Sequence, residues 1–193
     1  MSNGPFAEIL SIIEKAKSLG FRVLENGTQL VGAVPHVAPE AYIHKVFAPL
    51  SENQILYLEG AVLKRSIPAS YKELLAHCNG LSLFSGSLSL DGYRKSYTRH
   101  GDEVWQPFAI ETPNLIERPA DAERDAFFVG GYKADGSVLY ILEGKAYRSP
   151  RRSAKPLNEW NNFWEMLLSE TRRLAELFDE TGRKTNPNLP VTP

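Results

Sequence analysis

The sequence predicts an α+β fold in which helices pack on a mostly antiparallel sheet. Apolar residues recur at helical spacing near both ends of the chain and between residues 51 and 79. Between residues 81 and 148 apolar and polar residues tend to alternate, which is typical of half-buried strands. The segments between these strands are too short for helical crossovers, so neighbouring strands are expected to be antiparallel.

Composition and charge argue against several classes of protein. Hydrophobic residues make up 42% of the 193 residues, which is enough to bury a sizeable core. The formal net charge is -1, and direct nucleic-acid binding is therefore not expected, because it usually needs a basic excess. No stretch approaches the roughly 18 apolar residues of a membrane span, so no membrane contact is expected either.

The cysteine and histidine content indicates neither a disulfide nor a metal site. Cys78 is the only cysteine, which excludes an internal disulfide and fits the reducing environment of the cytoplasm. The histidines, His36, His44, His77 and His100, lack the spacing of metal ligands on a helix. We therefore expect folding to require no metal and no cofactor.

Residues 1–48 are predicted to form a helix followed by a hairpin. The helix is expected over residues 5–19, with a proline at its first position and a glycine after its end. Asn26-Gly27 between two β-prone runs predicts a tight hairpin turn, and a short strand is expected near residues 42–47. This region is either a decoration or part of the domain that follows.

Two helices and a series of strands are predicted in the middle of the chain. Ser51 and Gln54 have the spacing of a capping box, which marks the start of a helix. A second helix is expected from Pro68 to Asn79-Gly80, a pair that accepts the left-handed backbone of a helix end. Strands are expected at residues 81–93, 105–110, 126–132, 138–142 and 145–148.

A long amphipathic helix is predicted over residues 158–179, and residues 181–193 are expected to form a flexible tail. The apolar faces of the helices and one strand predict a single core. Its predicted members are Ile55, Leu58, Val62, Tyr71, Leu74, Leu75, Phe128, Trp160, Phe163 and Leu167.

Three motifs, in matching order and spacing, resemble the SMI1/KNR4 (SUKH) family. They are Pro49-Leu50-Ser51 with Ile67-Pro68-Ala69-Ser70-Tyr71 and Asn79-Gly80, then Phe127-Phe128-Val129-Gly130 with Asp135-Gly136-Ser137, and finally Trp160-Asn161-Asn162-Phe163-Trp164-Glu165-Met166-Leu167. The resemblance implies that residues 49–180 form a SUKH-like domain, in which helices pack on a curved, mostly antiparallel sheet.

The resemblance also implies a function. Members of the family bind other proteins and share no catalytic apparatus, so we expect a protein-binding domain, no enzyme and no catalytic residue. Bacterial members commonly serve as immunity proteins that neutralise a cognate toxin, often a nuclease. The alternative is a scaffold or regulatory module unrelated to toxins, because fold determines function only loosely.

Candidate contacts with a partner come from the residues themselves. Tyrosine and arginine dominate binding hot spots, and residues 93–100 mix the two. An acidic loop is either solvated or contacts a basic partner. The candidates are Tyr93, Arg94, Tyr97, Arg99, Asp121, Glu123 and Asp125, all expected on the sheet face that the helices leave open. A basic cluster is either a solvated surface or a contact for an acidic partner or RNA: Arg148, Arg151, Arg152 and Lys155.

Overall fold

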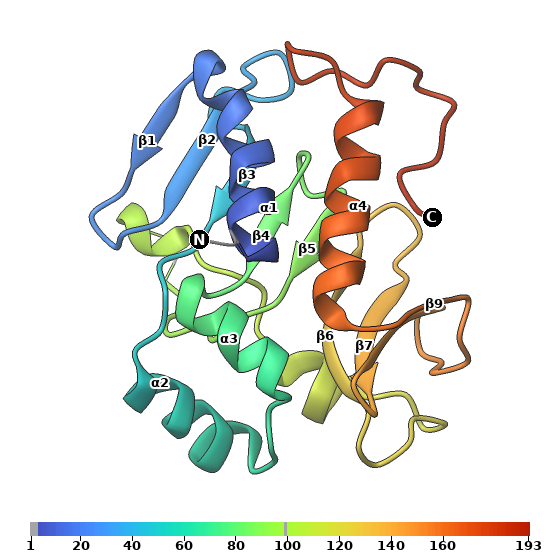
Figure 1. The fold of residues 1–193 in the computed structure, drawn as a ribbon. Helices are drawn as coiled ribbons and strands as arrows, with labels where there is room; N and C mark the ends of the chain where they lie inside the picture. The colour runs from blue at the N-terminus through green and yellow to red at the C-terminus, as the bar shows by residue number, and fades with distance from the viewer. Residues whose placement is uncertain (1–3, 99) are drawn as a thin grey trace.

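One antiparallel sheet organises the chain in the computed structural model, which describes residues 4–98 and 100–193 (Figure 1). Its nine strands follow one another in chain order, so each strand pairs with the one before it. The strands are β1 (Phe21–Val23), β2 (Gln29–Ala33), β3 (Tyr42–Val46), β4 (Leu81–Leu83), β5 (Leu88–Leu90), β6 (Phe127–Tyr132), β7 (Val138–Leu142), β8 (Lys145–Ser149) and β9 (Asn158–Trp160).

Helices α1 (Pro5–Glu14) and α4 (Phe163–Leu177) cover one face of this sheet (Figure 1). The other α-helices are α2 (Glu52–Tyr57) and α3 (Ala69–His77), and shorter helical turns are η1 (Lys15–Leu19), η2 (Leu58–Leu63), η3 (Gly101–Val104) and η4 (Thr112–Ile116). Helices α1 and α4 lie side by side over the strands, with α3 near their lower ends. The prediction of an α+β fold with helices on an antiparallel sheet is confirmed.

Two local predictions are confirmed at the level of atoms. The Ser51 hydroxyl accepts from the Gln54 amide at 3.3 Å, and the Gln54 side chain accepts from the Ser51 amide at 3.0 Å, which is a complete capping box. Asn26-Gly27 lies at the turn between β1 and β2, where Gly27 has the positive φ of 81° that such turns require.

The predicted strand over residues 81–93 is wrong, because the chain turns back within it. Phe84, Ser85 and Gly86 all have positive φ and join β4 to β5. Leucine and serine alternate on both sides of this turn, so the period of two continues through it. The turn also lacks the Asn-Gly pair that marks the first hairpin.

The predicted strand over residues 105–110 is also wrong. This segment forms only one isolated parallel bridge, between Gly92 and Ala109. Pro107 removes an amide donor from any ladder. The segment is held instead by the Gln106 side chain, whose oxygen accepts from the amide of Lys95 at 2.8 Å.

The predicted start of the last helix is wrong as well. Residues 158–160 form β9, and the helix begins at Phe163. Asn162 caps it, because its side-chain oxygen accepts from the Glu165 amide at 2.9 Å. Trp160 therefore belongs to a strand, not to the helical stripe that carries Trp164.

The main core lies between the helices and the sheet, and Tyr71, Phe127 and Phe163 are among its largest fully buried side chains. The predicted core is confirmed with three exceptions. Val62 and Trp160 are half-buried and pack against it. Phe128 belongs to a second cluster with Ala126 and Tyr140.

The position of Phe128 follows from strand alternation. Phe127 and Val129 belong to the main core, so Phe128 between them points to the opposite face of the sheet. There it is covered by the loops around Ala122 and Ala154. Loops thus shield part of this face, which no α-helix covers.

Across the described ranges of the chain, we find no helix with both the length and the apolar character needed to cross a membrane.

Candidate functional site

A row of residues across the open face of the sheet forms the floor of the candidate site. Lys45 pairs with Ser82, Ser82 with Ser89, and Ser89 with Gly131, so the four lie in register on β3, β4, β5 and β6. The adjacent Leu81 and its neighbours on the paired strands point into the helical core. Alternation therefore directs the row away from the helices. Three of its four members are small, which leaves a depression.

This depression is part of a groove of about 700 Å³. One wall is formed by the segment that follows β5, and the other by the loops next to β6, β7 and β8. The lining includes Tyr42 and Lys45 from β3, then Arg94, Val104, Trp105 and Phe108 from the segment after β5, and Lys133, Gly136, Val138, Arg151 and Arg152 from β7 and the loops beside β6, β7 and β8.

The first wall is rich in aromatic side chains. The Trp105 ring meets the Tyr42 ring edge to face at a centroid distance of 6.3 Å. The Lys45 ammonium lies 4.8 Å from the centre of the Trp105 ring, within the range of a cation–π contact. Phe108 remains 67% exposed, so this wall presents apolar surface to solvent.

The N-terminal hairpin holds this wall in place. Asn26 donates to the carbonyl oxygens of Asp102 and Trp105 at 2.9 and 3.3 Å, and the Thr28 hydroxyl also donates to Trp105. The Asp102 carboxylate accepts from the Glu25 amide at 2.9 Å. The hairpin of β1 and β2 thus helps to build the groove.

The second wall depends on Asp121. Its two carboxylate oxygens accept from the Ser153 hydroxyl at 2.8 Å and the Ala154 amide at 2.9 Å. These hydrogen bonds, with that from Ser153 the strongest, lower the pKa of the Asp121 carboxyl. Asp121 therefore fixes the loop that carries Arg151 and Arg152.

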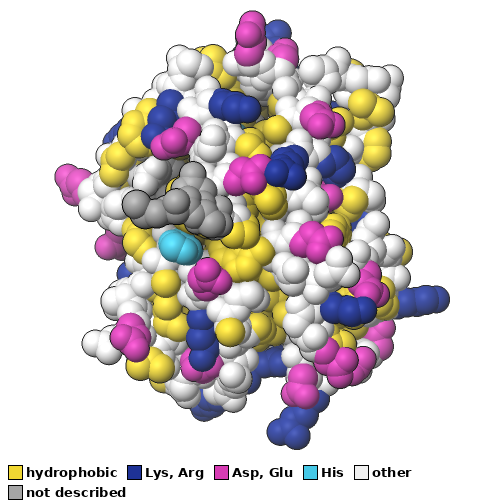
Figure 2. Space-filling model, viewed as in Figure 1, with side chains coloured by type: hydrophobic (Ala, Val, Ile, Leu, Met, Phe, Trp, Pro, Cys, Tyr) yellow, Lys and Arg dark blue, Asp and Glu magenta, His cyan; other side chains and the backbone are white. Residues whose placement is uncertain are grey.

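Positive charge gathers in the groove, although the whole chain carries -1. Five basic residues line it, namely Lys45, Arg94, Lys133, Arg151 and Arg152, against two acidic ones, Asp91 and Glu117. Burial, together with repulsion from Lys133, lowers the pKa of the Lys45 ammonium. By contrast, Figure 2 shows acidic and basic side chains intermixed over the helical face. An anionic group would therefore be favoured in the groove.

Asp91 is the buried acidic residue in the lining of the groove, and only 8% of it is exposed. Burial, reinforced by the nearby Glu111, raises the pKa of its carboxyl to about 8. Its backbone is held from two sides, because its amide donates to the Val129 carbonyl and its carbonyl accepts from the Tyr71 hydroxyl. Asp91 is therefore largely protonated at neutral pH.

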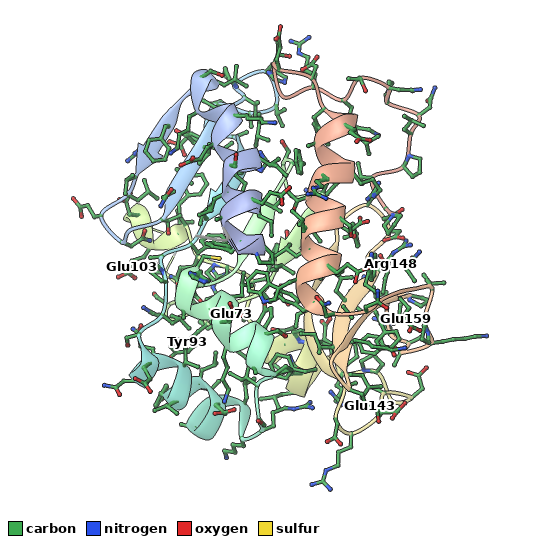
Figure 3. All side chains as sticks on the ribbon, in the orientation of Figure 1. Glu73, Tyr93, Glu103, Glu143, Arg148 and Glu159 are labelled. Carbon is green, nitrogen blue, oxygen red and sulfur yellow. The ribbon has the colours of Figure 1, made fainter. Side chains whose placement is uncertain are left out.

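The structure separates the predicted tyrosine and arginine contacts. Arg94 lines the groove, with its guanidinium 5.0 Å from the centre of the Tyr97 ring, and Tyr97 is 68% exposed. Tyr93 instead lies near α2 and α3 (Figure 3). The Asn79 side chain accepts a hydrogen bond from the Tyr93 amide and donates one to the Tyr93 carbonyl oxygen. Arg99 lies outside the described residues.

The predicted acidic loop divides in a similar way. Asp121 has the structural role described above, whereas Glu123 and Asp125 are exposed. The Glu123 carbonyl accepts from Arg118, which also donates to the Ala126 carbonyl at 2.8 Å. The acidic side chains lie on the loop that covers the second cluster, beside the groove.

The predicted basic surface cluster needs one correction. Arg148 is only 6% exposed, and it donates to Ser137 at 2.9 Å, to Asn158 at 2.9 Å and to Asp135 at 2.5 Å. It links β8 to Asn158 on β9 and to the turn before β7, and it is not a surface residue. Arg151 and Arg152, by contrast, line the groove.

Sequence reasoning missed the floor of the groove and its lysines. The floor comes from two Leu-Ser-Leu segments, at residues 81–83 and 88–90, whose central serines face away from the core. A repeated small polar residue between buried leucines was the available signal. The sequence around Lys45 and Lys133 did not indicate a site, because only strand pairing places the two lysines in the same groove.

A comparison with protein-family models and with curated protein sequences finds no match to this chain. The likeness to the SMI1/KNR4 family therefore continues to rest on the three motifs.

Proposed function

We propose that the protein is a non-catalytic binding domain whose protein partner occupies the groove on the open face of the sheet. The observation that carries this proposal is the groove itself, with its exposed aromatic wall and its excess of basic side chains. Aromatic residues and arginine are enriched in interfaces because they give large contact areas with polar ends. The partner segment that fits is apolar and carries acidic side chains.

The biological role we propose is that of a cytoplasmic immunity protein. It would cover a cognate toxin domain and so prevent the toxin from reaching its target. This role rests on the motif resemblance and on the presence of a preformed groove. The alternative is a scaffold or regulatory module that uses the same groove for another partner. Co-expression with the product of the adjacent gene separates them, because only an immunity protein restores growth that this product inhibits.

Asp91 provides the strongest argument for an enzyme, since a carboxyl protonated at neutral pH can act as a general acid. Two observations favour a structural role instead. Asp91 is buried, and the pKa of its carboxyl is raised chiefly by that burial. Glu111, its acidic neighbour, is not among the residues that line the groove. We therefore propose no reaction at this site.

Replacing Arg94 and Tyr97 together by alanine is expected to weaken partner binding by at least about 2 kcal/mol, roughly thirtyfold in Kd. The two side chains stack on each other, and Arg94 lines the groove. The affinity is measured by calorimetry with peptides selected from a random display library, and with the product of the adjacent gene. Arg172→Ala on α4 is the control, because this exposed arginine contacts Glu8 on the helical face. Unchanged affinity in the double variant would place the contact elsewhere.

A further inference from the structure

The groove floor brings together two lysines and two serine hydroxyls. Lys45, Ser82 and Ser89 lie in one cross-strand row, and side chains directly opposite each other in such pairs have Cβ atoms roughly 5 Å apart. Gly131 on β6 is the next position in this row. Lys133 lies two residues further along the chain, just after the end of β6, and it lines the same groove. Gly131 packs closely against the Ser137 backbone, so no side chain fits at this position of the row, and the floor beside the lysines is lined by Ser82 and Ser89.

These two ammonium groups lack a counter-charge. Within residues 4–98 and 100–193, neither Lys45 nor Lys133 takes part in an ion pair. They repel each other, and Lys45 is half-buried beside the Trp105 ring. An anion placed between them would relieve this repulsion and could accept hydrogen bonds from the Ser82 and Ser89 hydroxyls.

We infer that Lys45, Lys133, Ser82 and Ser89 form a carboxylate-binding subsite, which accepts an aspartate or glutamate side chain of the partner protein. This inference rests on the proposed function and specifies how the partner is recognised. The apolar wall around the subsite favours a carboxylate over the phosphates of a nucleic acid. Val104 and Phe108 are exposed on it, at 46% and 67%, and Val37 extends it. A single carboxylate flanked by apolar side chains fits such a wall, whereas a nucleic acid would bring a phosphate with every nucleotide.

The test uses a random peptide display library, panned on the protein. Selected peptides that compete with one another are expected to share an acidic residue. Changing that residue to its amide should weaken binding about tenfold to a hundredfold, the range for a hydrogen bond to a charged group. Lys45→Met and Lys133→Met should each weaken the same peptides, while Lys45→Arg should retain most of the affinity. Lys15→Met, an exposed lysine on the helical side, is the matched control. Thermal melts verify that each variant is folded.

The possible outcomes separate this inference from the proposed function. Peptides that bind the groove equally well with an amide in place of the acid would overturn the carboxylate subsite and leave the proposed function intact. If no selected peptide binds in the groove, both fail. Binding of a fluorescent single-stranded oligonucleotide that depends on Lys45 and excludes the peptides would also overturn the inference. The inference is supported if the amide peptides bind the original protein more weakly than the acidic peptides do, and if this difference disappears in Lys45→Met.

Discussion

Leu74→Ala is expected to lower the free energy of unfolding by about 2–5 kcal/mol. Leu74 is fully buried on α3, where it belongs to the main core between the helices and the sheet. Its truncation removes apolar contacts and leaves a cavity that a closely packed core closes only in part. Chemical denaturation monitored by circular dichroism measures the loss.

Leu56→Ala is the matched control for this change. It makes the same truncation on α2, but Leu56 is 55% exposed, so the expected loss is within about 0.5 kcal/mol. Equal losses in the two variants would contradict the packing of α3 on the sheet.

Asp91→Asn is expected to change the pH dependence of stability. The Asp91 carboxyl has a pKa of about 8 in the folded protein and an ordinary value of 3.8. Between these values the folded state keeps a proton that the unfolded state has lost, so rising pH lowers the free energy of unfolding. The slope is about 1.4 kcal/mol per pH unit, which gives up to about 4 kcal/mol between pH 5 and pH 8. Asparagine does not titrate, so the variant lacks this loss.

The measurement is a series of denaturation curves from pH 5 to pH 8 for both proteins. The variant should gain stability relative to the original protein as the pH rises, because all other titrating groups are shared. Asp125→Asn removes the same charge from an exposed loop and is the control. Parallel pH profiles for Asp91→Asn and the original protein would show that Asp91 is not held protonated by burial. Selected peptides should still bind the variant if Asp91 has a structural role.

The parts of the fold that could be predicted from sequence are those with a local physical cause. The capping box at Ser51 and the turn at Asn26-Gly27 are specified by neighbouring residues alone. The start of α4 was misplaced because Trp160 lies four residues before Trp164, which is the spacing of an apolar stripe on a helix. Residues 158–160 form a strand because they pair with β8, and such pairing depends on residues outside the segment.

The candidate site was harder to predict than the fold, because it is formed by residues far apart in the chain. Arg94 and the loop after β5 could be proposed from their composition. Lys45 and Lys133 could not, since they come together only when β3 to β6 align. Arg148 misled the prediction for a related reason: its partners are Asn158 on β9 and Ser137 in the turn before β7, and only the fold brings them to β8.

The N-terminal hairpin supports the aromatic wall of the groove. It fixes Asp102 and Trp105, and Trp105 in turn lies against Lys45. The aromatic wall of the groove therefore depends on this hairpin, whether residues 1–48 are a decoration or part of the domain. An alteration of Asn26 would therefore act on binding through Trp105.

Filling the groove tests whether the partner occupies it, when binding is compared with a matched change on the other face. Ser82→Tyr places a large side chain on the floor, at a strand position that tolerates aromatic residues. Ser11→Tyr makes the same substitution on the exposed side of α1. If the partner occupies the groove, calorimetry with the product of the adjacent gene or a selected peptide should show at least about a tenfold loss of affinity for Ser82→Tyr only. Unchanged affinity in a folded Ser82→Tyr variant would contradict the claim.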